Sequence, residues 1–189
     1  VSRSGLIAMA SSLDQIGPIT KTVGDAAILF KAIAGRDQFD ATSADSPTLL
    51  DLKLEDIKKM TIGLPEEYFI SGVEPQVIKA VEQAIEQLKS LGIKFKKISL
   101  PHTKYALSCY YIIMPAEVSS NLARFDGIRY GEVSGVRRKE STLAELYKKN
   151  RSYGFGQETK RRVILGTFVL SSGYYDAYYA KAQKVRALI

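Results

Sequence analysis

The chain has 189 residues, of which 46% are hydrophobic and 25% charged, and its formal net charge is +7. This composition predicts a soluble globular chain with a sizeable core and excludes disordered and collagen-like proteins. The apolar runs are only a few residues long, which excludes a membrane-spanning helix of roughly 20 apolar residues.

The cysteine and histidine counts exclude two kinds of stabilising site. A single cysteine, Cys109, cannot form an internal disulfide and fits a reducing compartment. A single histidine, His102, has no partners at metal-ligand spacing, so we expect no bound metal. The sequence starts at Val1 and shows no charged-then-apolar signal peptide. We therefore expect either a removed start or an internal piece of a longer protein.

The first hundred residues predict strands and helices in alternation. Residues 1–8 are expected to form a short strand or extended segment, followed by a loop that is punctuated by Gly17-Pro18. A helix is then predicted from an N-cap at Thr22 to a stop at Gly35, because apolar residues recur there at helical spacing.

A second strand–helix–strand unit follows a polar loop at 36–48. Strands are predicted at 61–64 and 93–101, and the helix between them begins at Pro75 and stops at Gly92. These lengths suit a right-handed crossover between two strands of one sheet.

The sequence changes to helical patterns after Pro101, which we interpret as a change of layer and not as a linker. Helices are expected on both sides of Pro115, because proline breaks helices, and the loop between the second and third helices is basic and rich in glycine. The five predicted helices span 102–113, 115–124, 142–151, 157–170 and 173–188, and the basic loop spans 125–142.

The positive charge is confined to the second half of the chain. Residues 1–101 contain 12 basic and 13 acidic side chains, whereas residues 102–189 contain 15 basic and 7 acidic ones. Ten of the eleven tyrosines also lie in the second half. Such a surface suits RNA or another polyanion, although a solvated basic helical face explains it equally well.

The residues alone show no complete catalytic constellation. There is no G-x-S-x-G nucleophile elbow, no phosphate-binding glycine loop, and only His102 could serve a serine–histidine triad. The polar loop 11–18 contains Ser11, Ser12, Asp14 and Gln15, but its simplest interpretation is a capped turn. Tyr174, Tyr175, Tyr178 and Tyr179 form two (i, i+4) pairs, a pattern that indicates packing against another layer or protomer more than a ligand cage.

Two further pairs of residues could belong to a binding site. Tyr110 and Tyr111 are adjacent on a predicted helix and point about 100° apart, so one could face a cavity while the other packs; alternatively, both are core tyrosines. Arg161 and Arg162 stand next to an apolar run, so at least one is expected to be partly buried beside an anion. That anion is either a bound carboxylate or an internal Asp or Glu.

Three segments carry a resemblance to a known family. The segment SSLDQIGPITKTVGDAAILFKAIAG, residues 11–35, resembles the stretch that follows the active-site strand in the amidase signature family. AEVSSNLARFDGIRYG (116–131) and RSYGFGQETKRRVILGTFVLSSGYYDAYYAKAQKVR (151–186) are similar to one branch of it, the A subunits of the glutamyl-tRNA(Gln)/aspartyl-tRNA(Asn) amidotransferases.

The resemblance implies an α/β fold: a mixed sheet with helices on both faces and a helix-rich second half. Residues 1–189 would be the middle-to-late portion of one amidase domain, without its N-terminal half and C-terminal end. The family's Ser–cis-Ser–Lys triad would then lie upstream of Val1. No residue of this chain is therefore assigned a catalytic role, and the loop 11–18 would form part of the wall of the active site without taking part in the reaction.

The resemblance also implies site residues. Tyr110 and Arg162 match positions that contact glutamine, with the arginine gripping its α-carboxylate, and Arg161 is the alternative if the register is shifted by one. An acidic residue for the amino group would lie beyond Ile189.

By the same resemblance, the full-length protein would hydrolyse glutamine and supply ammonia to convert Glu-tRNA(Gln) to Gln-tRNA(Gln). Its partners would be the B and C subunits of the amidotransferase, the acceptor end of tRNA(Gln) and glutamine, with no membrane. ATP and Mg would be used at the partner protein, and no cofactor would bind this chain. The location would be the cytoplasm or an organelle matrix, and the 189-residue piece alone would be inert and poorly stable.

The alternatives to this function are another amidase of small amides, or a non-catalytic remnant that binds RNA or a partner.

Overall fold

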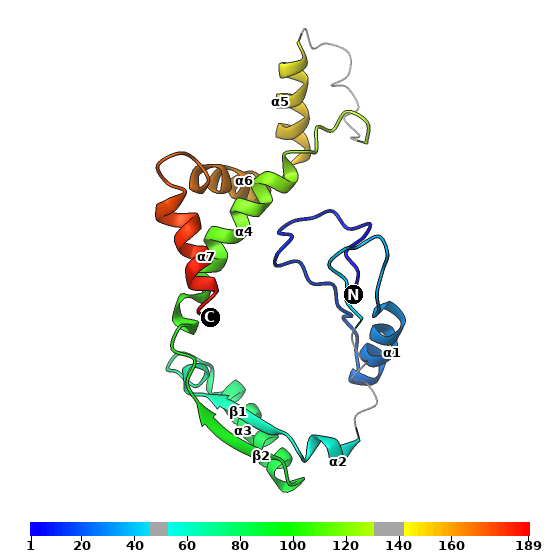
Figure 1. The fold of residues 1–189 in the computed structure, drawn as a ribbon, viewed down its shortest axis with the longest axis vertical. Helices are drawn as coiled ribbons and strands as arrows, with labels where there is room; N and C mark the ends of the chain where they lie inside the picture. Colours follow the sequence, from blue (N-terminus) through cyan, green and yellow to red (C-terminus); the bar gives the residue numbers. More distant parts are fainter. Residues whose placement is uncertain (46–52, 131–141) are drawn as a thin grey trace. The chain divides into compact units, whose positions relative to one another are not determined.

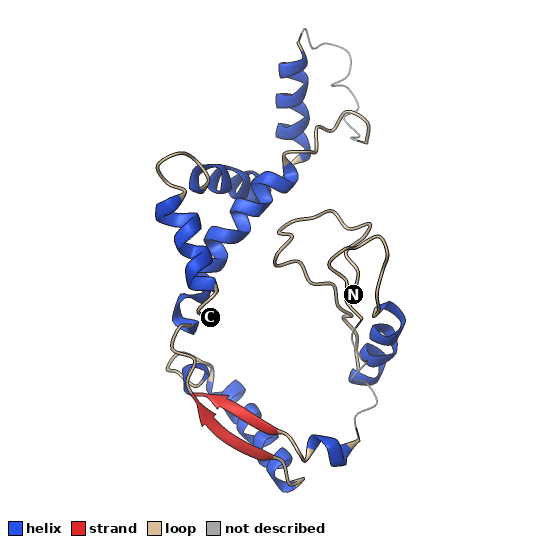
Figure 2. Cartoon of the chain, in the orientation of Figure 1, coloured by secondary structure: helices blue, strands red, loops and turns tan. Residues whose placement is uncertain are grey.

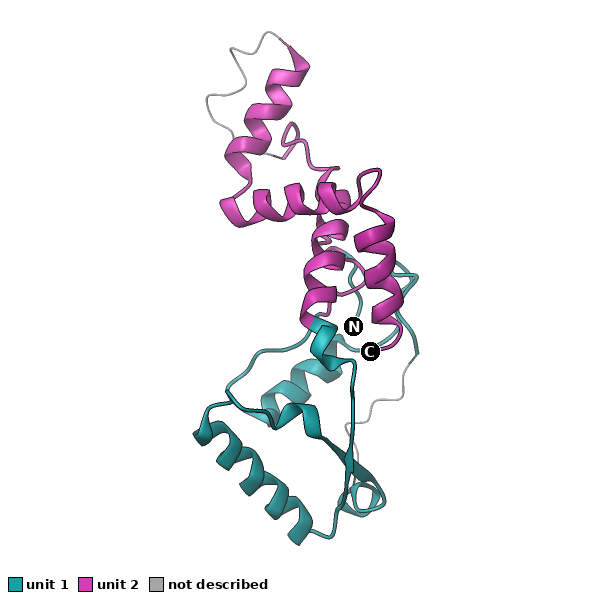
Figure 3. Cartoon of the chain, turned by 90° about the vertical axis from the view of Figure 1, so that its left-hand side faces the viewer, with its two compact units in different colours: residues 1–4, 16–106, 189 teal, residues 5–15, 107–188 magenta. Residues whose placement is uncertain are grey.

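The computed structural model describes residues 1–45, 53–130 and 142–189 (Figure 1). The chain divides into two compact units (Figure 3), one built from residues 1–4, 16–106 and 189 and the other from residues 5–15 and 107–188. The second unit therefore includes a loop from near the start of the chain. Most of the expected basic loop, residues 131–141, and the end of the polar loop at 36–48 lie outside the described residues.

The first helix forms where its capping pattern predicts it. Helix α1 spans Val23–Ile33, and the Thr22 side chain accepts a hydrogen bond from the Asp25 backbone N–H at 3.1 Å. Gly35, with φ of +143°, follows the end of the helix in a conformation that favours glycine.

The expected strand at residues 1–8 is wrong, because this segment contains turns and no strand. Its polar groups bond to a loop further along the chain instead of to a neighbouring strand. Ser2 Oγ donates to Asp37 Oδ2 at 2.6 Å, and the Arg3 backbone N–H donates to Asp40 Oδ2 at 2.9 Å. The bond from the Arg3 N–H, together with those from Thr42, holds the pKa of the Asp40 carboxyl well below its usual range.

The strand–helix–strand unit is confirmed as a parallel pair with a helical crossover (Figure 2). After the short helix α2, Leu54–Ile57, strand β1 spans Thr61–Pro65 and pairs in register with β2, Lys94–Ile98. Between them lie the 3₁₀ turn η2, Glu66–Tyr68, and helix α3, Pro75–Ser90. The described residues contribute these two strands to the sheet of the fold.

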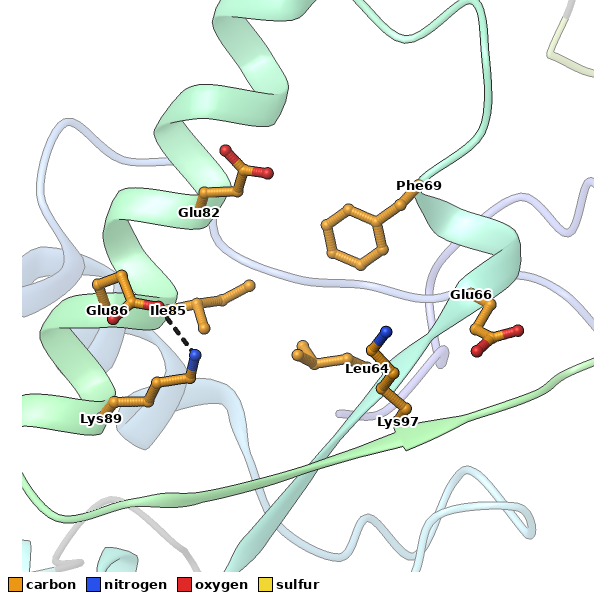
Figure 4. Close-up of a pocket in the computed structure, with 8 residues that line it drawn as sticks. All are labelled: Leu64, Glu66, Phe69, Glu82, Ile85, Glu86, Lys89 and Lys97. Atoms are coloured by element: carbon orange, nitrogen blue, oxygen red, sulfur yellow. Dashed lines mark hydrogen bonds and ion pairs between the residues drawn. The ribbon is translucent and has the colours of Figure 1, made fainter.

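Helix α3 has an apolar face that is only half covered. Ile78, Ile85 and Leu88 are partly buried, whereas Val77 and Val81 are exposed, and no residue of α3 is fully buried. Figure 4 shows the groove of about 620 Å³ between this helix and the strands, with Leu64, Phe69 and Ile85 inside it and a Glu86–Lys89 ion pair at its rim.

The second unit is built around one long helix, which corrects the predicted break at Pro115. A 3₁₀ turn, η3 (Thr103–Tyr105), leads into helix α4, Ala106–Leu122, which continues through Pro115. A proline inside a helix removes one backbone hydrogen bond and costs about 3 kcal/mol. Here Pro115 is fully buried, and its packing offsets the cost of the missing hydrogen bond. The helix therefore continues where the local pattern predicted a break.

The remaining helices surround α4. Helix α5, Leu143–Gly154, begins with the capping box Thr142–Glu145, and α6 spans Gln157–Val169. The helix expected at 173–188 is shorter and less regular than predicted, because Gly173 has φ of +86° and a π-helical turn, η4 (Asp176–Ala180), precedes α7, Lys181–Arg186.

The buried core of this unit lies on α4. One cluster joins Met114 and Val118 to Ala10 of the early loop and to Val163 of α6. The other joins Cys109 and Ile113 to Ala182 of α7. Helix α4 is therefore the element that α6, α7 and the loop 5–15 share. Among the helices that the structure describes, none is both long and apolar enough to cross a bilayer.

Candidate substrate-binding site

Helices α4 and α6 approach closely enough to place side chains from both into one site. The contact point is Gly166, where an added Cβ would overlap the Pro115 carbonyl oxygen and lie 2.8 Å from Ser119 Cβ. Only glycine allows the two backbones to come this near. Arg162 lies on α6, one helical turn before Gly166. Met114 and Tyr110 lie on α4, before Pro115.

Arg162 is held by contacts with both helices. Its Nε donates to Glu158 Oε1 at 2.8 Å, and its Nη1 lies 3.3 Å from the sulfur of the fully buried Met114. The hydrogen bond to Glu158 and, after it, the interaction with Tyr110 raise the pKa of the Arg162 guanidinium. Arg162 of α6 therefore lies against α4 near Tyr110, the residue that, like Arg162, the resemblance implied as a contact of glutamine.

Tyr110 lies beside Tyr111 in an edge-to-face arrangement, with ring centroids 5.3 Å apart and planes at 76°. Both rings remain partly exposed, so neither is a core tyrosine. The divergence of adjacent helical side chains explains why only Tyr110 interacts with the arginine.

Arg161 and Arg162 differ sharply in environment. The side chain of Arg161 is 69% exposed, whereas that of Arg162 is 26% exposed. Arg161 donates to Glu158 Oε2 at 2.6 Å, so one carboxylate bridges both arginines. The internal ion pair that we considered as the simpler explanation therefore exists. Arg162 differs from Arg161 in that it also contacts α4, at Met114.

The polar loop 11–18 is tied to α4 and α7. The Ser12 backbone N–H donates to Glu117 Oε2 at 2.9 Å, and Ser12 Oγ also bonds to this carboxylate. Arg186 donates to Ser12 Oγ at 2.7 Å and to the Ser12 carbonyl at 2.9 Å. The side-chain amide of the buried Asn121 donates to Met9 O and to Ser11 Oγ. These bonds hold residues 9–12 firmly within the second unit.

A shallow pocket of about 260 Å³ lies over this network. It is lined by side chains from the loop, from α4 and from the C-terminal region, including Ser11, Glu117, Asn121 and Tyr179. Within it Ser12 bonds to Glu117 and Asn121 donates to Ser11, and the role of the loop as part of an active-site wall stays a prediction.

Other candidate residues do not join the site. Cys109 is buried, and its Sγ lies 3.6 Å from the Ala182 carbonyl oxygen, as expected of a packing residue. Within the described residues, no three His, Cys, Asp or Glu side chains cluster as metal ligands. The tyrosine pairs form as the spacing predicts. The ring centroids are 6.1 Å apart in Tyr174–Tyr178 and 5.3 Å apart in Tyr175–Tyr179, and the ring of Phe168 packs against Tyr174 of the first pair.

Sequence reasoning missed three residues that organise the site. Glu158 precedes Arg162 by four positions, a spacing that signals a helical ion pair and could have been noticed. Met114 and Asn121 gave no such signal, because Arg162, which Met114 contacts, and the early loop, to which Asn121 bonds, are distant from them in sequence.

Comparison with known proteins shows to which family the chain belongs. The model of the amidase family matches residues 1–189, the whole chain. The chain belongs to the amidase family. The expected family resemblance and its α/β fold are thereby confirmed.

Several relatives of this amidase chain carry a more specific name. The A subunit of glutamyl-tRNA(Gln) amidotransferase from Carboxydothermus hydrogenoformans is 57% identical over the whole chain, which spans 39% of that relative. The protein of the same name from Fusobacterium nucleatum is 56% identical, again over the whole chain and 39% of the relative. A crystal structure is known for a protein of the same name from Thermotoga maritima, which is 42% identical in sequence to this chain. The two folds match with a TM-score of 0.67 over the whole of this chain and 36% of the other.

The amidase chain thus spans about two fifths of the length of the curated relatives that it matches. The position of the hydrolytic lysine and serines upstream of Val1 stays a prediction, as do the roles of Tyr110 and Arg162 and the inactivity of the 189-residue piece.

Proposed function

We propose that the full-length protein is the glutamine-hydrolysing component of a tRNA-dependent amidotransferase. Water would hydrolyse the side-chain amide of glutamine to give glutamate and ammonia, and the ammonia would convert Glu-tRNA(Gln) to Gln-tRNA(Gln). The hydrolytic groups would be supplied by residues outside 1–189. The names of relatives at 53–57% identity support this proposal.

The observation that carries the proposal is the contact of Arg162 with α4: its Nη1 lies 3.3 Å from the sulfur of Met114, one helical turn from Tyr110. A free amino acid differs from a small amide by its charged α-carboxylate. The planar guanidinium of arginine offers that carboxylate two parallel hydrogen bonds, and a tyrosine hydroxyl can orient it. Within the proposal, Arg162 grips the carboxylate of glutamine and Tyr110 lies beside it.

The assembly follows from the same proposal. The B and C subunits would complete the complex, and the acceptor end of tRNA(Gln), ATP and Mg would bind at the partner protein. The complex would work in the cytoplasm or in an organelle matrix.

The proposal is tested in the full-length protein assembled with its partners. Arg162→Ala should raise the KM for glutamine by about 100-fold, because the loss of hydrogen bonds to a charged group costs about 3 kcal/mol. Activity with ammonium in place of glutamine should stay unchanged, because ammonium bypasses this site. The matched variant Arg161→Ala should change the KM by less than about threefold, because an exposed ion pair contributes little.

Two results would reject this assignment. An unchanged KM in Arg162→Ala would remove Arg162 from the site. A larger effect of Arg161→Ala than of Arg162→Ala would shift the substrate contact to the neighbouring arginine.

A further inference from the structure

Glu158 is placed to control the orientation of Arg162. Its two carboxylate oxygens bond to different arginines, Oε1 to Arg162 Nε at 2.8 Å and Oε2 to Arg161 Nη1 at 2.6 Å. Both pairs lie within α6, at spacings of four and three residues. The carboxylate is thus fixed by two cations and by the rigid helix that carries all three side chains.

The hydrogen bond to Arg162 is also the strongest influence on the carboxylate itself. It is the main reason that the pKa of Glu158 is lowered, ahead of the charges of Arg161 and Arg162. Glu158 also lies in the first turn of α6, where the helix dipole favours a negative charge. The carboxylate therefore remains ionised and available to Arg162 throughout the neutral pH range.

An arginine that binds a carboxylate must present its planar fork in one orientation. Its side chain is long and has many rotamers, so an unsupported guanidinium loses conformational entropy when it binds. Glu158 holds the Nε of Arg162, and the buried sulfur of Met114 contacts Nη1. The fork is thus fixed from its own helix and from α4 before any ligand arrives.

We propose that Glu158 is a positioning residue, which orients the Arg162 guanidinium for the carboxylate of an amino-acid substrate. The inference rests on the proposed function, because it assumes that Arg162 contacts the substrate. Glu158 itself acts through Arg162 and does not touch the substrate.

The test measures glutamine kinetics in the full-length protein with its partners. Glu158→Ala should raise the KM for glutamine by about tenfold and change kcat by less than about twofold, because it disturbs binding and not the chemical step. Glu158→Gln should give an intermediate KM, because its amide oxygen still accepts a hydrogen bond from Nε but carries no charge. Ammonium-supported activity should be unchanged in both variants.

Glu86→Ala is the matched control, because Glu86 forms a comparable exposed ion pair with Lys89, at 2.8 Å, on helix α3. Its KM for glutamine should remain that of the unchanged protein. A merely structural role of Glu158 would lower stability and leave the KM alone.

The outcomes separate the two proposals. If Arg162→Ala raises the KM while Glu158→Ala and Glu158→Gln leave it unchanged, the positioning role is overturned and the proposed function stands. If Arg162→Ala also leaves the KM unchanged, both are overturned. Should Glu158→Ala fail to assemble, an increase in KM of about threefold in Glu158→Gln supports the role, and an unchanged KM overturns it.

Discussion

Gly166 of α6 lies directly against the backbone carbonyl of Pro115 in α4, at a distance that leaves no room for a Cβ atom. The two residues join a helix that keeps its course through a proline to a helix that carries Arg162. The position of the guanidinium beside Tyr110 depends on this close approach.

Gly166→Ala should therefore destabilise the full-length protein by about 1–3 kcal/mol, because the added methyl must push the two backbones apart. Thermal or urea unfolding measures the effect. Gly154→Ala is the control: nothing lies within 4 Å of a Cβ at that position, so a neutral or slightly stabilising change is expected there. Equal effects of the two substitutions would show that the contact is not as close as described.

Asn121 connects the early loop to α4. Its amide donates to Met9 O at 3.1 Å and to Ser11 Oγ at 3.0 Å, and its Oδ1 accepts from Arg124 at 2.9 Å. Asn121→Ala should cost about 1–3 kcal/mol of unfolding free energy, because buried polar groups lose their partner. The exposed Gln76→Ala serves as the control. A loss no larger than that of the control would argue against a structural role for this side chain.

The contacts of Asp40 predict how the start of the chain responds to acid. Its pKa is lowered, first by the Arg3 backbone N–H and then by Thr42. A carboxyl with a lowered pKa contributes stability that is fully present above its ordinary value of 3.8 and is lost as the pH falls through the lower, folded value. Protection of the Arg3 amide from hydrogen exchange should therefore be retained down to pH 3.8, where a carboxyl of ordinary pKa would be half protonated.

Asp40→Ala should abolish that protection even at neutral pH, because it removes the acceptor of the Arg3 amide. Loss of about half of the protection in the unchanged protein at pH 3.8, relative to pH 7 after correction for intrinsic exchange, would contradict the lowered pKa.

The local patterns predicted the elements well where capping and periodicity agree. Thr22 caps α1 as the sequence predicts, and α5 begins within one residue of the predicted start at Thr142. Pro115 misled the prediction, because a local rule about proline carries no information on burial by neighbouring helices. The residues 1–8 misled it for a related reason: their bonding partners, Asp37 and Asp40, lie some 35 residues further on.

The site shows the same division. The residue patterns offered two pairs, Tyr110 with Tyr111 and Arg161 with Arg162, and the family resemblance favoured Tyr110 and Arg162, with Arg161 as the alternative. The choice depends on the direction in which α6 faces α4, and the Gly166 contact sets that direction. Met114 lies far from Arg162 in sequence, so only the packed structure places its sulfur against the guanidinium.

The most direct test of the central claim compares two substrates in two proteins. Glutamine and 4-aminobutanamide carry the same amide and amino groups, but the second lacks the α-carboxylate. The full-length complex should prefer glutamine in kcat/KM by about 100-fold or more, and Arg162→Ala should reduce that preference to a few-fold by slowing glutamine hydrolysis alone. An Arg162→Ala variant that loses activity on both amides equally, and so keeps the preference, would contradict the assignment of Arg162 to the substrate carboxylate.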